Sequence, residues 1–157
     1  KQKGEPYELL DFSPYGYDER QYCSPGFNLP VGSLTRTPHG RFAEYHTSAD
    51  NLEFVQPAHL ADSLATYQAV VDVLEKNAQY RNTNPHCEPQ LGKRGLYSAF
   101  GGKKDTKARE MAMLWVLNLS DGEHTLLDIA NRAGLPFALV WEVAQTLQEH
   151  HLLEPCA

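Results

Sequence analysis

One short segment carries side chains that could do chemistry at a metal ion. Residues 44–53 read Glu-Tyr-His-Thr-Ser-Ala-Asp-Asn-Leu-Glu. The run Arg41–Tyr45 is typical of a strand, and it would carry the imidazole of His46 into a polar turn. An imidazole at a strand end suits a metal site, and the phenol of Tyr45 could donate to a developing oxyanion. Asp50 could hold the loop behind His46 or simply cap the turn. A lone histidine in a loop is more often structural, so the segment alone leaves both interpretations open.

A second candidate is the charged loop that holds Asp18, Glu19 and Arg20, with Cys23 shortly after it. Composition alone favours a solvated turn. Arg20 could bind a substrate carboxylate through its planar guanidinium group. No basic side chain adjoins Cys23, so a cysteine-nucleophile mechanism has weak support.

These two segments resemble a known family. The pattern Tyr45-His46-Thr47-x-x-Asp50 resembles the last metal motif of co-catalytic zinc aminopeptidases. The upstream run of residues 11–26 is similar to the signature of a bacterial and archaeal family of aminopeptidase-like proteins that end in a winged helix. The resemblance implies that His46 is a zinc ligand and that Tyr45 hydrogen-bonds the tetrahedral intermediate. It also implies that the loop from Asp18 to Cys23 shapes the substrate pocket.

The resemblance also implies that most of the metal site lies outside this chain. The family's other ligands are a His, a bridging Asp, a Glu-Glu pair that includes the general base, and a further Asp, and they precede the matched segment. This chain has no other His-x-Asp or Glu-Glu element. A two-zinc site needs several carboxylates and imidazoles. We therefore expect the chain to be the C-terminal part of a two-zinc enzyme and to be inactive alone.

Composition narrows the class of protein. A chain of 157 residues with 41% hydrophobic content can form one domain or two small ones with a real core. No stretch approaches eighteen consecutive apolar residues, so we expect no membrane span, and the first residues lack the apolar region of a signal peptide. Three cysteines at unrelated spacings favour free thiols in a reducing cytoplasm over a disulfide framework.

The first half of the chain changes period at Pro57. Before it, extended runs at Tyr7–Phe12, Asn28–Leu34 and Arg41–Tyr45 alternate with Pro and Gly. The runs Asn28–Thr37 and Arg41–His46 could pair as neighbouring strands. After it, the spacing predicts a helix that ends near Asn77 and covers one face of a sheet with an apolar stripe. That stripe consists of Leu60, Leu64, Tyr67, Val71 and Leu74.

The C-terminal part shows the pattern of a helix-turn-helix or winged helix. The sequence predicts a helix over 105–118 and a capping box formed by Thr125 and Asp128 at the start of the next one. A Gly134-Leu135-Pro136 turn leads into a further helix, and residues 151–154 form a closing strand. We expect three regions: residues 1–80 as the C-terminal part of an aminopeptidase-like domain, 81–102 as a linker, and 103–157 as a winged helix-turn-helix domain.

The charge of this tail argues against DNA binding. Residues 103–157 hold five Lys and Arg against eight Asp and Glu, a net charge of −3, and residues 136–150 contain no Lys or Arg. Phosphate contacts from basic side chains supply most affinity for duplex DNA. We expect instead a packing module, a lid or a homo-oligomer contact. The expected contact surface contains Trp115, Phe137, Val140 and Trp141.

The sequence thus predicts an α/β fold, the C-terminal portion of a sheet sandwiched by helices, followed by a small winged-helix domain. The implied function is zinc-dependent hydrolysis of an N-terminal peptide bond or a related amide, with a peptide or small amide as substrate. Two alternatives stay open. One is a non-catalytic protein of the same fold that binds a small amine or peptide. The other, disfavoured by charge, is a winged-helix DNA-binding regulator.

Overall fold

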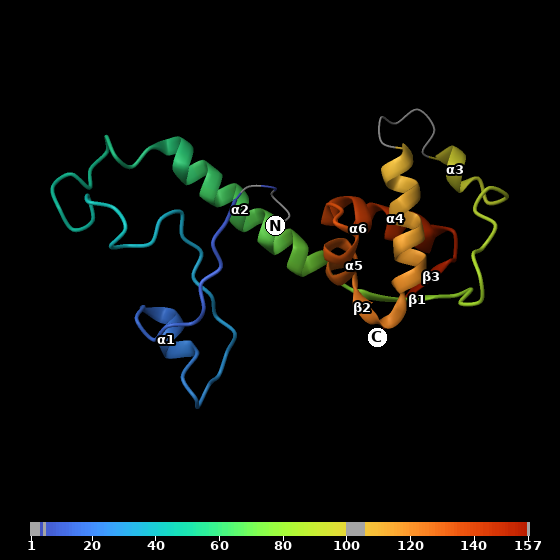
Figure 1. Cartoon of the computed structure of the whole chain (residues 1–157), viewed down its shortest axis with the longest axis horizontal. Helices are drawn as coiled ribbons and strands as arrows, with labels where there is room; N and C mark the ends of the chain where they lie inside the picture. The colour runs from blue at the N-terminus through green and yellow to red at the C-terminus, as the bar shows by residue number, and fades with distance from the viewer. Residues whose placement is uncertain (1–3, 5, 100–105, 157) are drawn as a thin grey trace. The chain divides into compact units, whose positions relative to one another are not determined.

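The computed structural model describes residue 4 and residues 6–99 and 106–156. The chain divides into two compact units, with the boundary between Tyr67 and Gln68. Its elements in order are α1 (Asp18–Tyr22), α2 (Pro57–Lys76), β1 (Gln79–Asn82), α3 (Leu96–Ala99), α4 (Thr106–Leu119), β2 (Asp121–Thr125), α5 (Leu126–Ala133), α6 (Phe137–Glu149) and β3 (Leu153–Pro155). Figure 1 shows them along the chain.

The first unit consists mainly of loops and turns. Its described residues form α1 and the first half of α2 but no strand, so the prediction of paired strands at Asn28–Thr37 and Arg41–His46 is wrong. A strand is stable only when a neighbouring strand pairs with its backbone N–H and C=O groups. In this unit the backbone bonds are local: the N–H of Arg41 donates to the carbonyl of Pro38, and that of Thr47 donates to the carbonyl of Glu44. His46 therefore lies in a series of turns.

Helix α2 forms where the sequence predicts it, but its apolar stripe is not buried. The helix begins at Pro57, whose missing N–H needs no partner in the first turn. Leu60, Leu64 and Leu74 are 61%, 60% and 71% exposed, and no residue of α2 is buried within the described structure. Within the second unit, only Val73 of this helix packs against the core. The expectation that the stripe covers a sheet is not met by the described residues.

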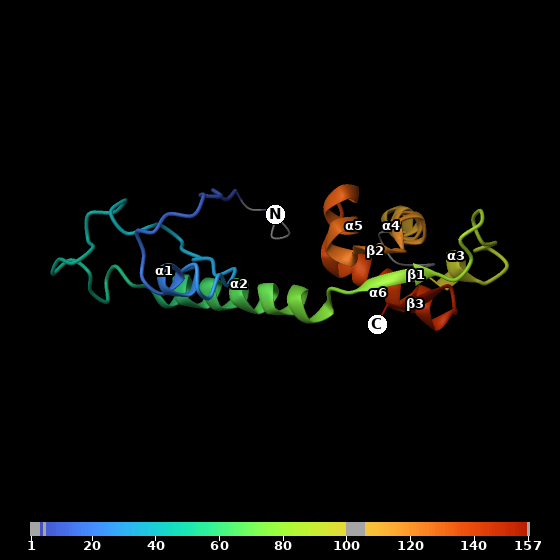
Figure 2. The ribbon, with the colours of Figure 1, turned by 90° about the horizontal axis from the view of Figure 1, so that it is seen from below.

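In the second unit, helices α4, α5 and α6 pack beside a small antiparallel sheet (Figures 1 and 2). Helices α4, α5 and α6 contact one another, and the sheet has the order β2-β1-β3. The core between them is fully apolar at its centre, and each large side chain buried there contributes roughly 1.5–3 kcal/mol. Its largest fully buried members include Met113, Val116, Ile129, Val140, Val143 and Leu147.

The turn between α5 and α6 follows the sequence pattern closely. Thr125 and Asp128 form the predicted capping box at the start of α5. Gly134 ends that helix in the left-handed conformation, with φ of 66°, which suits a residue without a Cβ atom. Pro136 then precedes α6. This is the helix-turn-helix that the sequence predicts.

Strand β1 is the central strand of the sheet, although the sequence did not predict it. Tyr80 pairs with Pro155 of β3, and Arg81 pairs with Asp121 of β2 on the other side. The segment expected to be a linker, 81–102, therefore begins inside β1. It also supplies Leu91 and Leu96 to the core of the second unit and contains the short helix α3.

The remaining tail elements lie close to their predicted positions. Helix α4 spans Thr106–Leu119 against the predicted 105–118, and Asp105 lies outside the described residues. The closing strand β3 spans Leu153–Pro155. Among the described helices, none has the length and apolar character needed to cross a membrane.

Candidate functional site

Tyr45 lies at the centre of an aromatic cluster in the first unit. Its ring centroid is 4.0 Å from that of His46, 5.5 Å from that of His39 and 5.8 Å from that of Phe42. The hydroxyl oxygens of Tyr45 and Tyr17 are 3.3 Å apart, within hydrogen-bond distance. Tyr45, the first residue of the predicted Tyr45-His46 pair, is thus contacted by Tyr17, His39 and Phe42 of the same unit.

His39 is a member of this cluster that the sequence pattern did not single out. Besides Tyr45, its ring faces Tyr15 at 5.8 Å and Tyr17 at 6.1 Å between centroids. In the sequence, His39 is visible only as part of a Pro-His-Gly turn. The one available signal was the high density of Tyr and Phe around the two histidines. The ring of Tyr45 thus contacts two imidazoles, those of His39 and His46.

The phenol of Tyr45 is protonated at neutral pH, as that of an ordinary tyrosine is. The hydrogen bond with Tyr17 raises the pKa of Tyr45, and partial burial adds to the rise. A phenol with a raised pKa is neutral at physiological pH and has an O–H to donate. Tyr45 therefore has the protonation state that an oxyanion donor needs.

His46 is exposed and adopts a left-handed backbone conformation, with φ of 58°. Thr47 holds the turn around it, because its hydroxyl donates to the carbonyl of Glu44 at 2.8 Å and accepts from the N–H of Ala49 at 3.2 Å. Asp50 takes part through its backbone N–H, which donates to the carbonyl of Thr47. The side chain that organises this loop is therefore Thr47.

The charged residues upstream form a short helix. Asp18, Glu19 and Arg20 all belong to α1, and Glu19 accepts a hydrogen bond from the N–H of Tyr17 at 3.3 Å. Tyr17 in turn contacts Tyr45, so α1 is linked to the aromatic cluster through one residue. Within the described part of the chain, no hydrogen bond or ion pair joins Asp18 or Arg20 to His46.

Cys23 follows α1 and points at the backbone. Its thiol donates to the carbonyl of Leu29 at 3.2 Å and lies 3.4 Å from that of Val31. These bonds stabilise the chain reversal after α1. The thiol is free of any disulfide.

The described residues do not form a complete zinc site. Across residues 6–99 and 106–156, no three His, Cys, Asp or Glu side chains gather in a way that could hold a metal ion. Catalytic zinc needs three protein ligands and an open position. His46 is exposed and could supply one ligand, so the described chain offers at most part of such a set.

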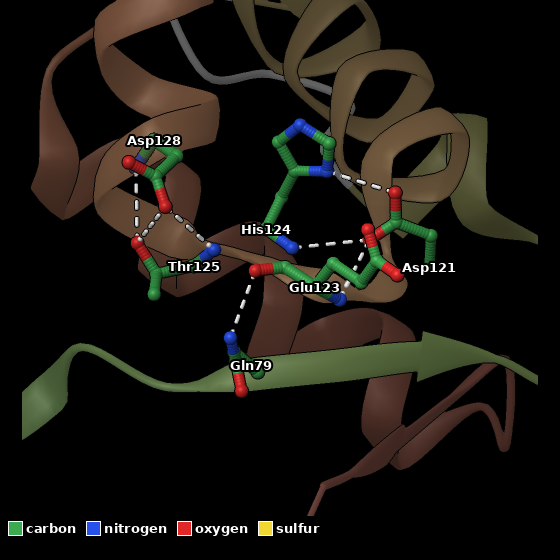
Figure 3. A network of polar contacts seen from close by, with 6 residues as sticks. All are labelled: Gln79, Asp121, Glu123, His124, Thr125 and Asp128. Atoms are coloured by element: carbon green, nitrogen blue, oxygen red, sulfur yellow. Dashed lines mark hydrogen bonds and ion pairs between the residues drawn. The ribbon is translucent and has the colours of Figure 1, made fainter.

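A separate polar network fixes the start of α5 in the second unit (Figure 3). The carboxylate of Asp121 accepts hydrogen bonds from the N–H groups of Glu123 and His124, at 2.8 and 3.0 Å, and one of its oxygens lies 2.8 Å from Nδ1 of His124. The two backbone bonds, followed by His124 itself, lower the pKa of Asp121 to about 2. Gln79 of β1 joins the network by donating to the carbonyl of Glu123 at 2.8 Å.

The same network contains the capping box of α5. Asp128 accepts from the hydroxyl of Thr125 at 2.6 Å and from its N–H at 2.9 Å, and these two bonds lower the pKa of Asp128. The side chains of Gln79, Asp121, Thr125 and Asp128 all bond to groups of β2 or α5. The network is structural: it shapes β2 and the first turn of α5.

Comparison with known proteins places both halves of the chain. Residues 78–155 match the winged helix-turn-helix family, and residues 1–77 match a domain family of unknown function, DUF4910. A protein of Clostridium acetobutylicum, named "Putative polysaccharide biosynthesis protein with aminopeptidase-like domain", is 52% identical over 151 residues. That match covers 96% of this chain and 35% of the relative.

A solved structure agrees with the sequence match. It is the crystal structure of a "putative peptidase" from Clostridium acetobutylicum, with 47% identity and a TM-score of 0.86. The match covers 98% of this chain and 33% of the solved one. This chain thus spans about a third of the length of the relatives it matches, in their C-terminal part. The chain is a homologue of the C-terminal part of aminopeptidase-like proteins and ends in a winged helix-turn-helix domain.

Proposed function

We propose that this chain forms part of a zinc-dependent, aminopeptidase-like hydrolase that cleaves an N-terminal peptide bond or a related amide. The observation that carries the proposal is the motif segment itself, in which the exposed imidazole of His46 follows the phenol of Tyr45 directly. The names of the two relatives support a peptidase-like activity. The remaining metal ligands and the general base would come from residues outside this chain.

The proposed roles follow from the chemistry of the two side chains. The imidazole of His46 is exposed and so could reach a metal ion as one ligand. A zinc ion bound there would supply Lewis acidity to the reaction. The phenol of Tyr45 carries an O–H at neutral pH and would donate it to the oxygen that becomes negatively charged.

Helix α1 would shape the substrate pocket. Asp18, Glu19 and Arg20 lie on this helix, and its link to Tyr45 through Tyr17 brings it to the aromatic cluster. Arg20 would bind a carboxylate of a peptide substrate through its guanidinium group. The winged-helix domain would pack against the rest of the enzyme or against a second copy, without binding nucleic acid.

Zinc analysis of the complete protein tests the proposal. We expect His46→Ala to hold less zinc than the wild type, because one ligand is lost. His59→Ala is the matched control, since His59 is also exposed and belongs to α2. Equal zinc content in the wild type and in His46→Ala would contradict the assignment of His46.

A measurement on the wild type separates the proposal from a non-catalytic protein of the same fold. The enzyme should bind zinc and release the N-terminal residue from peptide amides. A complete protein that binds peptides or amines without zinc and without hydrolysis would instead belong to the non-catalytic alternative.

A further inference from the structure

Helix α4 carries an apolar patch on its exposed side. Met111 and Leu114 are 43% and 37% exposed, and with Trp115 and Asn118 they line a hollow of about 250 Å³. All four residues belong to α4, so the hollow lies on the surface of this helix. Among the described residues that follow α2, the one other exposed large apolar side chain is Tyr97. Exposed apolar patches of this kind mark interaction sites.

A charged side chain stands at each end of this patch. Lys107 is exposed and precedes Met111 by one helical turn, so it lies at the N-terminal end. Asp121 lines a second hollow together with Leu114 and Asn118, so it lies at the C-terminal end. Its side chain is 44% exposed, and hydrogen bonds within β2 hold it in place. We call this surface the α4 face: Lys107, Met111, Leu114, Trp115, Asn118 and Asp121.

The α4 face is complementary to itself. Leu114 lies midway between the two charges, seven residues after Lys107 and seven before Asp121. When two copies pack their α4 helices antiparallel across a two-fold axis at Leu114, each Lys107 meets Asp121 of the other copy. The apolar side chains at the centre then cover one another. One ion pair forms at each end of the contact, as two-fold symmetry requires.

This order of charges selects a copy of the same chain over other occupants. A nucleic acid would meet a carboxylate and an apolar surface, neither of which binds phosphate. Another segment of the complete protein would have no need of opposite charges at equal distances from Leu114. Glu110 flanks the face and is half-buried, and in the antiparallel pair it falls near Asn118 of the other copy. The side-chain amide of Asn118 is a hydrogen-bond donor for that carboxylate.

We propose that the protein forms a two-fold dimer in which the α4 faces of two copies pack antiparallel. The apolar centre supplies the affinity, and the two ion pairs fix the orientation. Because the face is small and its ion pairs are exposed, the dimer is reversible, with a Kd between about 1 and 100 µM. The contact belongs to the winged-helix unit and does not depend on Tyr45 or His46.

Sedimentation velocity of the complete protein across this concentration range tests the proposal. Leu114→Lys places two ammonium groups against each other at the two-fold axis and should raise Kd at least about tenfold. Tyr97→Lys is the matched control, because it adds the same charge at an exposed apolar residue outside the α4 face, and it should keep the wild-type Kd. A wild-type protein that stays monomeric, or a dimer that Leu114→Lys leaves intact, would overturn the proposal.

The response to salt tests the ion pairs separately. Added salt should weaken the wild-type dimer, because it screens the attraction between Lys107 and Asp121. Lys107→Glu should raise Kd about fivefold at low salt, and added salt should then strengthen the dimer by screening a repulsion. The same response to salt in both proteins would remove Lys107 from the interface.

A zero-length cross-link tests the orientation without any substitution. A carbodiimide joins a lysine amine directly to a carboxylate. Within one chain, Lys107 and Asp121 are separated by the length of α4, about 20 Å at 1.5 Å per residue, so they can be joined only between copies. A mixture of ¹⁵N-labelled and unlabelled protein should give mixed-isotope peptide pairs that link Lys107 to Asp121. A dimer that gives no such pair would contradict the antiparallel arrangement.

Discussion

The contacts around Tyr45 bear directly on its proposed role as a hydrogen-bond donor. Its hydroxyl meets that of Tyr17, and its ring contacts two histidines and Phe42. Such packing limits the rotamers of the phenol, and a donor that is already oriented stabilises a transition state without reorganising.

Tyr45→Phe should therefore reduce turnover while leaving metal binding unchanged. The variant keeps the ring and its stacking but loses the O–H donor. Loss of one oxyanion donor typically lowers kcat about 100- to 1,000-fold. Steady-state kinetics and zinc analysis of the complete protein check this, with Tyr7→Phe as the control because Tyr7 is exposed outside the cluster. A variant with wild-type kcat would remove Tyr45 from the reaction.

The lowered pKa of Asp121 predicts that the stability of the second unit depends on pH. Its pKa is about 2 in the folded chain against an ordinary value of 3.8. Because the folded pKa is lower, the stabilisation is fully present above about pH 4 and is lost as the pH falls towards 2. The carboxylate is 44% exposed, so solvent screening limits the effect to at most about 1 kcal/mol.

Thermal unfolding between about pH 2 and 5 measures this effect. Asp121→Asn should lower the melting temperature at neutral pH and flatten its decline between about pH 4 and 2, because the titrating group is gone. Glu75→Gln, at an exposed position of α2, is the control and should keep the wild-type slope. A wild-type slope in Asp121→Asn would assign the acid sensitivity to other groups.

Part of the site was predictable at the residue scale, because it is contiguous in sequence. The Tyr45-His46 pair stands in one short motif, and the structure brings the two rings into contact. His39 and Tyr17 contact Tyr45 from other loops of the same unit. Neither the periodicity nor the spacing of residues in the sequence predicts such a contact.

At the scale of elements, the capping box of α5 should contribute measurable stability. Thr125 accepts a bond from the N–H of Asp128 at 3.2 Å, and the reciprocal bond to Asp128 is also present. Thr125→Ala removes an N-cap side chain, which typically costs about 1 kcal/mol. Urea unfolding should show this loss for Thr125→Ala, and no comparable change for Thr37→Ala in an exposed loop of the first unit. Equal stability of both variants would show that the cap contributes nothing.

The helices were more predictable than the strands, and the reason is physical. The 3.6-residue period of α2 and the cap and turn residues around α5 and α6 are local signals. Strand β1 has only four residues, of which Tyr80 alone is buried, and both of its partners lie far along the chain. In the first unit, the extended runs do not form strands. Composition cannot reveal whether a neighbouring strand is present to pair with them.

At the scale of the whole molecule, the net negative charge of residues 103–157 disfavours nucleic-acid binding. The second helix of the helix-turn-helix, α6, has no Lys or Arg, and its Glu142 pairs with Arg109 of α4 at 2.6 Å. Titration with duplex DNA at low salt should show no binding tighter than about 100 µM, the weak end of non-specific binding. An acidic protein of similar size is the control. Tight binding that weakens steeply with salt would contradict this prediction.

The apolar surface expected on the tail is smaller than the sequence indicated. Phe137 and Val140 are buried in the core of the second unit, whereas Trp115 and Trp141 are partly buried against it. The exposed apolar residues of α4 are Met111 and Leu114. A homo-oligomer contact through this domain therefore stays a proposal, and its surface would be centred on α4.

The position of β1 between β2 and β3 also has a consequence for biosynthesis. The register joins Asn82 to Leu153, so the strand emerges from the ribosome 71 residues before its second partner. At about 5–20 residues per second, the edge of β1 that faces β3 waits roughly 4–14 s for that partner. An unpaired strand edge is a template for pairing with other chains. The nascent protein therefore offers an unpaired strand edge to other chains during that interval.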